Sequence, residues 1–147
     1  MNASNPRRRQ RGSVTIWGIG LTLIIAAFAG VVLDTWRVFA ERQDISGMAD
    51  SAAIAGATAI DIAYLNETGE IRLEEDAAAD RAAEYLANQD GWSDEILPDI
   101  DVSTDGTIIT VVLEKDVDFT LLGPLLPGEA PLRITVTAYA APNVVDP

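Results

Sequence analysis

The feature that most constrains the fold is an unbroken apolar run near the N-terminus. The run covers the 21 uncharged residues 13–33, which follow four arginines (Arg7, Arg8, Arg9 and Arg11) and precede the first acidic residue, Asp34. As a helix it spans about 31 Å, which matches the hydrocarbon layer of a bilayer, about 30 Å. A soluble helix of this length would show a polar stripe, and beyond Thr15 and Thr22 none is present. We therefore expect residues 13–33 to form a transmembrane helix behind a basic tail, residues 1–12.

The flanking residues predict how this helix is oriented. Trp17 and Trp36 lie about 28 Å apart on a helix, which is where interfacial aromatic belts occur. The arginine cluster keeps the N-terminus in the cytoplasm by the positive-inside rule. Residues 34–147 are then expected outside the cytoplasm, so the chain would be a single-pass membrane protein.

A cleaved signal peptide is the alternative interpretation of the same run. Ala27, Phe28 and Ala29 form an A-x-A cleavage pattern behind a basic start. The apolar run continues past that pattern to Leu33, and it exceeds the usual length of a signal core, about 7–15 residues. The pattern favours a retained anchor, and the alternative is a secreted soluble binding domain released near Ala29.

The composition of residues 34–147 argues against several classes of function. This part holds all 23 acidic residues and only six of the ten basic ones, a net charge of −17. Such a surface repels nucleic acid phosphates, so we expect no nucleic acid partner. The chain has no cysteine and no histidine, which removes the thiolate nucleophile, the commonest general base and the commonest zinc ligands. We expect no enzyme activity, no cofactor and no metal.

Three aspartates of the C-terminal half are candidate ligands for calcium. Asp99, Asp101 and Asp105 are close in sequence. An EF-hand loop beginning at Asp101 needs a glutamate at its twelfth position, where Val112 stands. We therefore interpret them as solvated carboxylates near a turn.

Proline spacing divides the chain into a helical and a strand-forming part. No proline occurs between Pro6 and Pro98, and this stretch is rich in Ala, Glu and Leu. We expect the first helix to continue through an extension, 34–63, then a turn at 66–70 and a second helix at 72–88. The apolar face of the extension is expected at Val38, Ile45, Met48, Ala49, Ala52, Ala55, Ala59 and Ile62. The contact residues of the second helix are expected at Leu73, Ala77, Ala83, Tyr85 and Leu86.

Residues 98–141 are expected to form a small antiparallel sheet. Ile109, Val111 and Leu113 share one face of a strand in ITVVL (109–113), apolar and polar residues alternate in LRITVTAYA (132–140), and Asp105-Gly106 is a hairpin turn signal. One face would pack on helix and the other would face water. The order of helices followed by strands gives an α+β fold.

Two segments resemble a known family. The resemblance lies in the segments RQRGSVTIWGIGLTL and VVLDTWRVFAERQDISGMADSAAIAGA. In these segments the chain resembles the TadE/TadG-like proteins of tight-adherence (Tad, Flp-type) pilus assembly, which are pilin-like. The resemblance implies that residues 34–147 form a pilin-like domain outside the bacterial cell membrane. It also implies a structural or assembly role in a pilus or a related secretion machinery. The implied partners are other pilin-like membrane subunits, in homo- or hetero-oligomers, and an inner-membrane assembly platform.

One departure from processed pilins bears on the N-terminus. In those proteins a peptidase cuts after a glycine, and a glutamate five residues later pairs with a neighbouring subunit. Gly12 is the candidate processing site here, but the fifth residue is Trp17 and the first glutamate is Glu41. This departure favours a permanent anchor, which the resemblance to TadG-type members also implies.

Two further sets of residues are candidate contact sites. Small residues recur every four positions in the apolar run, which predicts a packing face for another transmembrane helix, at Gly18, Thr22, Ala26 and Gly30. The loop LLGPLLPG carries leucines that would either dock a partner or the lipid surface, or else pack under the sheet edge, namely Leu121, Leu122, Leu125 and Leu126.

Overall fold

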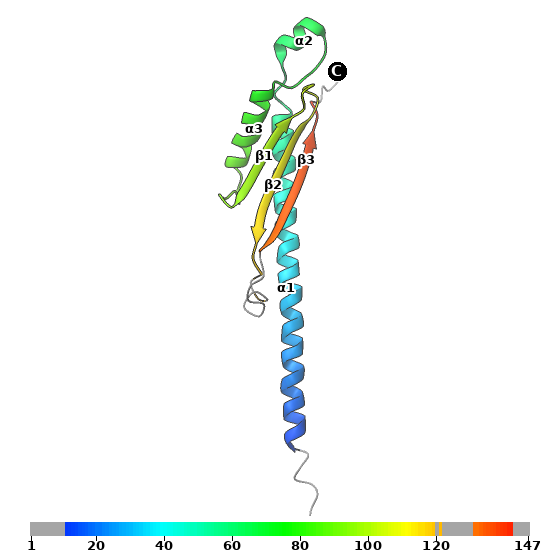
Figure 1. The fold of residues 1–147 in the computed structure, drawn as a ribbon, viewed down its shortest axis with the longest axis vertical. Helices are drawn as coiled ribbons and strands as arrows, with labels where there is room; N and C mark the ends of the chain where they lie inside the picture. The colour runs from blue at the N-terminus through cyan, green and yellow to red at the C-terminus, as the bar shows by residue number, and fades with distance from the viewer. Residues whose placement is uncertain (1–10, 120, 122–130, 143–147) are drawn as a thin grey trace, which may run out of the picture. The chain divides into compact units, whose positions relative to one another are not determined.

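The computed structural model describes residues 11–119, 121 and 131–142, which form the expected α+β fold (Figure 1). The helices are α1 (Arg11–Gly56), α2 (Ile62–Thr68) and α3 (Glu75–Ala87), and the strands are β1 (Ile96–Val102), β2 (Ile109–Val117) and β3 (Leu132–Ala140). The chain divides into two compact units. The first unit comprises residues 1–37 and 119–129, and the second unit comprises residues 38–118 and 130–147.

The first unit contains the N-terminal part of α1. Its apolar residues form regular helix, as expected for a run without proline. Residues 14–33 are exposed, apart from Gly20 and Gly30, which are half-buried. None of the described side chains in residues 14–33 is buried, in contrast to the side chains of a protein core.

The second unit is built on a three-stranded antiparallel sheet in the order β1-β2-β3. The central strand sets the register, with Val111 opposite both Ile100 of β1 and Ala138 of β3. The inward side chains of β2 and β3 are buried as the alternation predicts: Ile109, Val111, Leu113, Ile134, Val136 and Ala138. The other face carries exposed polar residues such as Thr135, Thr137 and Tyr139.

Helices pack on the apolar face of the sheet through small side chains. The helical members of the core are mostly alanines of α1 and α3: Ala49, Ala52, Ala53, Ala78 and Ala82, each with no exposed surface. Two larger side chains, Ile45 and Leu86, complete this layer. Because alanine projects so little from the helix, the backbones of α1, α3 and the sheet come close together.

The first helix ends earlier than the sequence indicated. We expected it to reach Ala63, but α1 ends at Gly56. A turn follows, and an isolated bridge pairs Ile60 with Leu73. Asp61 then caps a separate helix, α2, by accepting a hydrogen bond from the Tyr64 N–H at 2.9 Å. Ile62, expected on the apolar face, is consequently 61% exposed.

Other boundaries also differ from the expectation. Part of the expected 66–70 turn is helical, since α2 runs to Thr68 and ends at Gly69, whose φ of 76° is the left-handed conformation that glycine adopts at helix ends. The next helix, α3, begins at Glu75. β1 begins at Ile96 and so includes Pro98, which an edge strand tolerates.

The contact residues expected for the second helix are only partly buried. Leu86 of α3 and Leu73, which precedes α3, are buried as expected, but Ala83 and Tyr85 are exposed and Ala77 is only half-buried. Ala78 and Ala82 are the alanines that face the core.

Candidate functional site

The candidate functional site of the first unit is the apolar part of α1. Among the described residues one helix, Val14–Gly56, is long and apolar enough to cross a membrane, with a mean hydropathy of 2.4 over its most apolar window and none of that window buried. Its large side chains are uncovered, with Trp17 77% and Phe28 69% exposed. A core helix of a soluble protein would bury one face, so this segment fits a single-pass membrane anchor.

The residues expected to orient the anchor are only partly described. Trp17 and Trp36 are both exposed, at 77% and 69%. Arg11 and Gly12 belong to the first turn of α1, while Arg7, Arg8 and Arg9 lie outside the described residues. The cytoplasmic N-terminus and processing at Gly12 therefore stay predictions.

The four small residues of the apolar run are not equivalent. A Cβ placed on Gly18 would meet nothing within 4 Å, and Ala26 is exposed. The Thr22 hydroxyl donates to the Gly18 carbonyl at 2.9 Å, which satisfies it within the helix. Gly30, in contrast, faces Leu121, whose Cβ would lie 3.7 Å from a Cβ placed on Gly30. Packing of another helix on this face stays a prediction.

Asp34 links the end of the apolar run to Leu121. The Leu121 N–H donates to both carboxylate oxygens of Asp34, at 3.0 and 3.3 Å. Asp34 is only 3% exposed, whereas the Leu121 side chain is 46% exposed. The other leucines of the predicted contact loop, Leu122, Leu125 and Leu126, lie outside the described residues.

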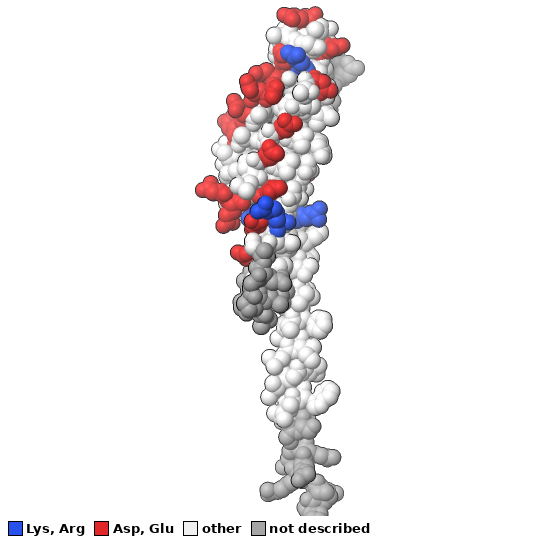
Figure 2. Space-filling model, viewed as in Figure 1, with Lys and Arg blue, Asp and Glu red and all other residues white. Residues whose placement is uncertain are grey.

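The surface of the second unit is strongly acidic. Figure 2 shows acidic side chains gathered over α3 and the sheet, with smaller basic groups between them. Ion pairs hold several of the basic residues. Lys115 of β2 pairs with Glu41 of α1, and on the exposed sheet face Arg133 pairs with Asp116 at 2.9 Å and with Glu114 at 3.6 Å. The hydrogen bond from Arg133 lowers the pKa of Asp116 and raises that of Arg133.

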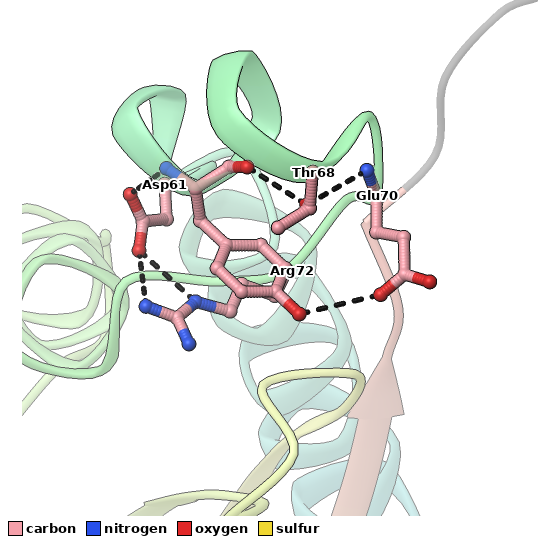
Figure 3. Close-up of polar contacts among 5 residues, drawn as sticks. Asp61, Thr68, Glu70 and Arg72 are labelled. Atoms are coloured by element: carbon pink, nitrogen blue, oxygen red, sulfur yellow. Dashed lines mark hydrogen bonds and ion pairs between the residues drawn. The ribbon is translucent and has the colours of Figure 1, made fainter.

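A polar cluster fixes the segment between α1 and α3 (Figure 3). Arg72 donates to Asp61 Oδ2 through Nε at 3.0 Å and Nη2 at 2.7 Å, and its guanidinium carbon lies 3.9 Å from the centre of the Tyr64 ring. The Tyr64 hydroxyl donates to Glu70 at 3.2 Å. The Tyr64 N–H and then the Arg72 side chain lower the pKa of Asp61. Every one of these bonds joins residues of one connecting segment, so the cluster is structural.

The three candidate calcium ligands belong to a strand and a turn. Asp99 and Asp101 lie on β1, and Asp105 lies in the β1–β2 connection. Ser103 and Thr107 donate to Asp105 Oδ1 at 2.6 and 2.7 Å, and these bonds lower the pKa of Asp105 to about 2. Within residues 11–119, 121 and 131–142 no group of three acidic side chains is placed to hold a metal ion.

These features define a class: a protein whose described residues contain a helix that fits a membrane anchor and a small α+β unit. Residues 12–59 match the model of a family described as putative Flp pilus-assembly TadE/G-like. The match confirms the TadE/TadG-like resemblance and supports a pilus-related component. It covers α1 and the turn after it, but not α3 or the sheet. No curated protein and no solved structure matches the chain.

Sequence reasoning missed the two polar contacts that organise the connections. The bond from Leu121 to Asp34 joins positions 87 residues apart, and no local pattern encodes it. The cap at Asp61 had a signal, since an aspartate before an apolar residue is a frequent helix start. Apolar residues recur at helical spacing on both sides of Asp61, and this pattern favours one continuous helix over a helix start at Asp61.

Proposed function

We propose that this chain is a membrane-anchored structural or assembly component of a Tad/Flp-type pilus or a related secretion machinery, similar to a minor pilin or pseudopilin. Residues 1–12 would form a cytoplasmic tail, 13–33 the transmembrane helix and 34–147 a pilin-like domain outside the membrane. The observation that carries the proposal is the uncovered apolar part of α1 within a segment that matches the TadE/G-like family. The role is mechanical: the protein acts by contacts and catalyses no reaction.

The proposed partners are other pilin-like membrane subunits and the inner-membrane assembly platform. Small residues support this because they let two helices approach closely in lipid. Three of the four, Gly18, Thr22 and Ala26, are exposed, so the face that they form is accessible to a second helix. The second unit would add contacts through its exposed surfaces.

Two neighbouring alanines provide a matched test of the packing face. Ala26 belongs to the small-residue face, Ala27 lies about 100° around the helix, and both are exposed. Ala26→Leu is expected to reduce co-purification of pilin-like partners in detergent, while Ala27→Leu keeps it. Equal effects of the two variants would remove the packing face from the proposal.

Deletion and fractionation test the role itself. Deleting the protein is expected to abolish or reduce piliation, and the full-length chain is expected to stay in the membrane pellet after carbonate extraction. Unchanged piliation together with unchanged partner co-purification would overturn the assembly role. A full-length chain that stays in the supernatant without detergent would overturn the anchor.

The mature N-terminus separates the anchor from its alternatives. Mass spectrometry of the native protein is expected to find Met1 or Asn2. A chain beginning at Ser13 would indicate pilin-type processing after Gly12. A chain beginning at Gly30 would indicate the alternative, a secreted binding domain.

A further inference from the structure

We propose that Leu121 is a second membrane contact of this protein, a side chain that enters the lipid interface where the anchor helix leaves the bilayer, with Asp34 as the residue that positions it. The inference rests on the proposed anchor. It adds a lipid surface as the binding partner of a residue 87 positions away from that helix boundary.

The position of Leu121 relative to the proposed membrane boundary follows from its hydrogen bonds. Asp34 is the first charged residue after the apolar run, so it marks the membrane boundary of the proposed anchor. The Leu121 N–H lies 3.0 and 3.3 Å from the two Asp34 carboxylate oxygens. The backbone of Leu121 is therefore held at the boundary.

The direction of the side chain follows from Gly30. Gly30 and Asp34 are one helical turn apart on the same face of α1, with Gly30 inside the apolar run. The Leu121 Cβ would lie 3.7 Å from a Cβ placed on Gly30, while its N–H points at Asp34. The Leu121 side chain thus extends from the boundary toward the apolar run, where a glycine leaves room for it.

Electrostatics explain why a boundary carboxylate suits this contact. A carboxylate near hydrocarbon is costly unless it is paired or hydrogen-bonded, and Asp34 is 3% exposed. The Leu121 N–H supplies a charge-assisted bond to each oxygen. The same bond that satisfies Asp34 brings an apolar side chain to the level of the lipid.

The exposed part of Leu121 favours lipid over water as its surroundings. The side chain remains 46% exposed after contact with α1. The neighbouring residues of the helix, Val31 and Leu33, are 44% and 55% exposed and belong to the segment proposed to lie in lipid. Leu121 therefore continues an apolar surface that the bilayer already covers in the proposed arrangement.

The absence of cysteine from the chain allows a clean test. Single-cysteine variants Leu121→Cys and Tyr139→Cys of the full-length protein are labelled with an environment-sensitive dye in phosphatidylcholine/phosphatidylglycerol vesicles. Tyr139 is the control because it is 70% exposed on β3 of the second unit. The label at 121 is expected to emit at shorter wavelength, to be quenched by a doxyl lipid, and to be several-fold less accessible to iodide than the label at 139.

A second substitution tests the positioning role of Asp34. Asp34→Ala in the Leu121→Cys chain is expected to raise iodide quenching at 121 several-fold. Thr35→Val, which removes an exposed hydroxyl that donates to the Val31 carbonyl, is expected to leave it unchanged. No change with Asp34→Ala would overturn the positioning role.

The outcomes separate this inference from the anchor. A labelled chain that fails to float with the vesicles overturns both proposals. A floating chain whose 121 label is quenched by iodide as strongly as the 139 label overturns the lipid contact alone. Protection from iodide without quenching by the doxyl lipid also overturns it, since the site is then covered by protein.

Discussion

Gly56, the last residue of α1, lies directly against Ile109 of the central strand. A Cβ placed on Gly56 would collide with Ile109 Cδ1, and it would also lie 2.8 Å from the Ala78 carbonyl oxygen of α3. The glycine therefore sits at a close approach of α1, α3 and β2. This packing requires a residue without a side chain at position 56.

We expect Gly56→Ala to lower the free energy of unfolding of the second unit by about 1–3 kcal/mol, since the Ala78 carbonyl cannot move away without shifting α3. Gly47→Ala is the matched control, because a Cβ there would meet nothing within 4 Å in the same helix. Alanine is the better helix former, so this variant is expected to gain about 0.5–1 kcal/mol. Urea unfolding of the full-length protein in detergent measures both, and effects of the same sign would contradict the packing argument.

The ion pair between Glu41 and Lys115 ties α1 to β2. Its side chains are 35% and 17% exposed, so water screens the pair only in part. Glu41→Gln is expected to cost about 1 kcal/mol, because it leaves the half-buried Lys115 ammonium without its counter-charge. A double-mutant cycle with Lys115→Met measures the coupling, and additive effects would show that the pair contributes nothing.

The sheet could be predicted from the sequence because strand residues differ sharply in character. In β2 and β3 apolar residues recur at every second position, from Ile109 to Leu113 and from Ile134 to Ala138, and burial follows that period. The buried face of α3 could not be predicted in the same way, because its candidate residues do not differ in character. Its alanines are chemically identical, so periodicity could not decide that Ala78 and Ala82, rather than Ala83, face the core.

The end of α1 and the boundary contact depend on the tertiary structure. Helix propensity favours continuing through Ala57 and Ala59, but the chain turns after the close approach at Gly56 and pairs Ile60 with Leu73. The contact between Asp34 and Leu121 joins positions 87 residues apart, so no local sequence pattern could indicate it. For the candidate site, the apolar helix could be predicted from the sequence, but the approach of Leu121 to Gly30 could not.

Asp105 is expected to make the second unit more sensitive to acid. Hydrogen bonds from Ser103 and Thr107 lower its pKa from 3.8 to about 2, so its contribution to stability is present above pH 3.8 and is lost as the pH falls through 2. The difference in free energy of unfolding between the wild type and Asp105→Asn should therefore shrink between these values. Denaturant unfolding at a series of pH values measures it, with Asp101→Asn as the control for one lost negative charge. A constant difference across this range would contradict the prediction.

Arg72 should control the order of α2 through its planar guanidinium. It donates to Asp61 through two nitrogens while it stacks on Tyr64, and a lysine ammonium cannot make both contacts. Arg72→Lys is therefore expected to speed amide exchange of residues 62–69 several-fold and to leave β2 amides unchanged, because the cluster holds only the connecting segment. Arg81→Lys is the control, since Arg81 donates to Thr58 outside this cluster. Equal changes of α2 exchange in both variants would contradict a specific role of the Arg72 guanidinium.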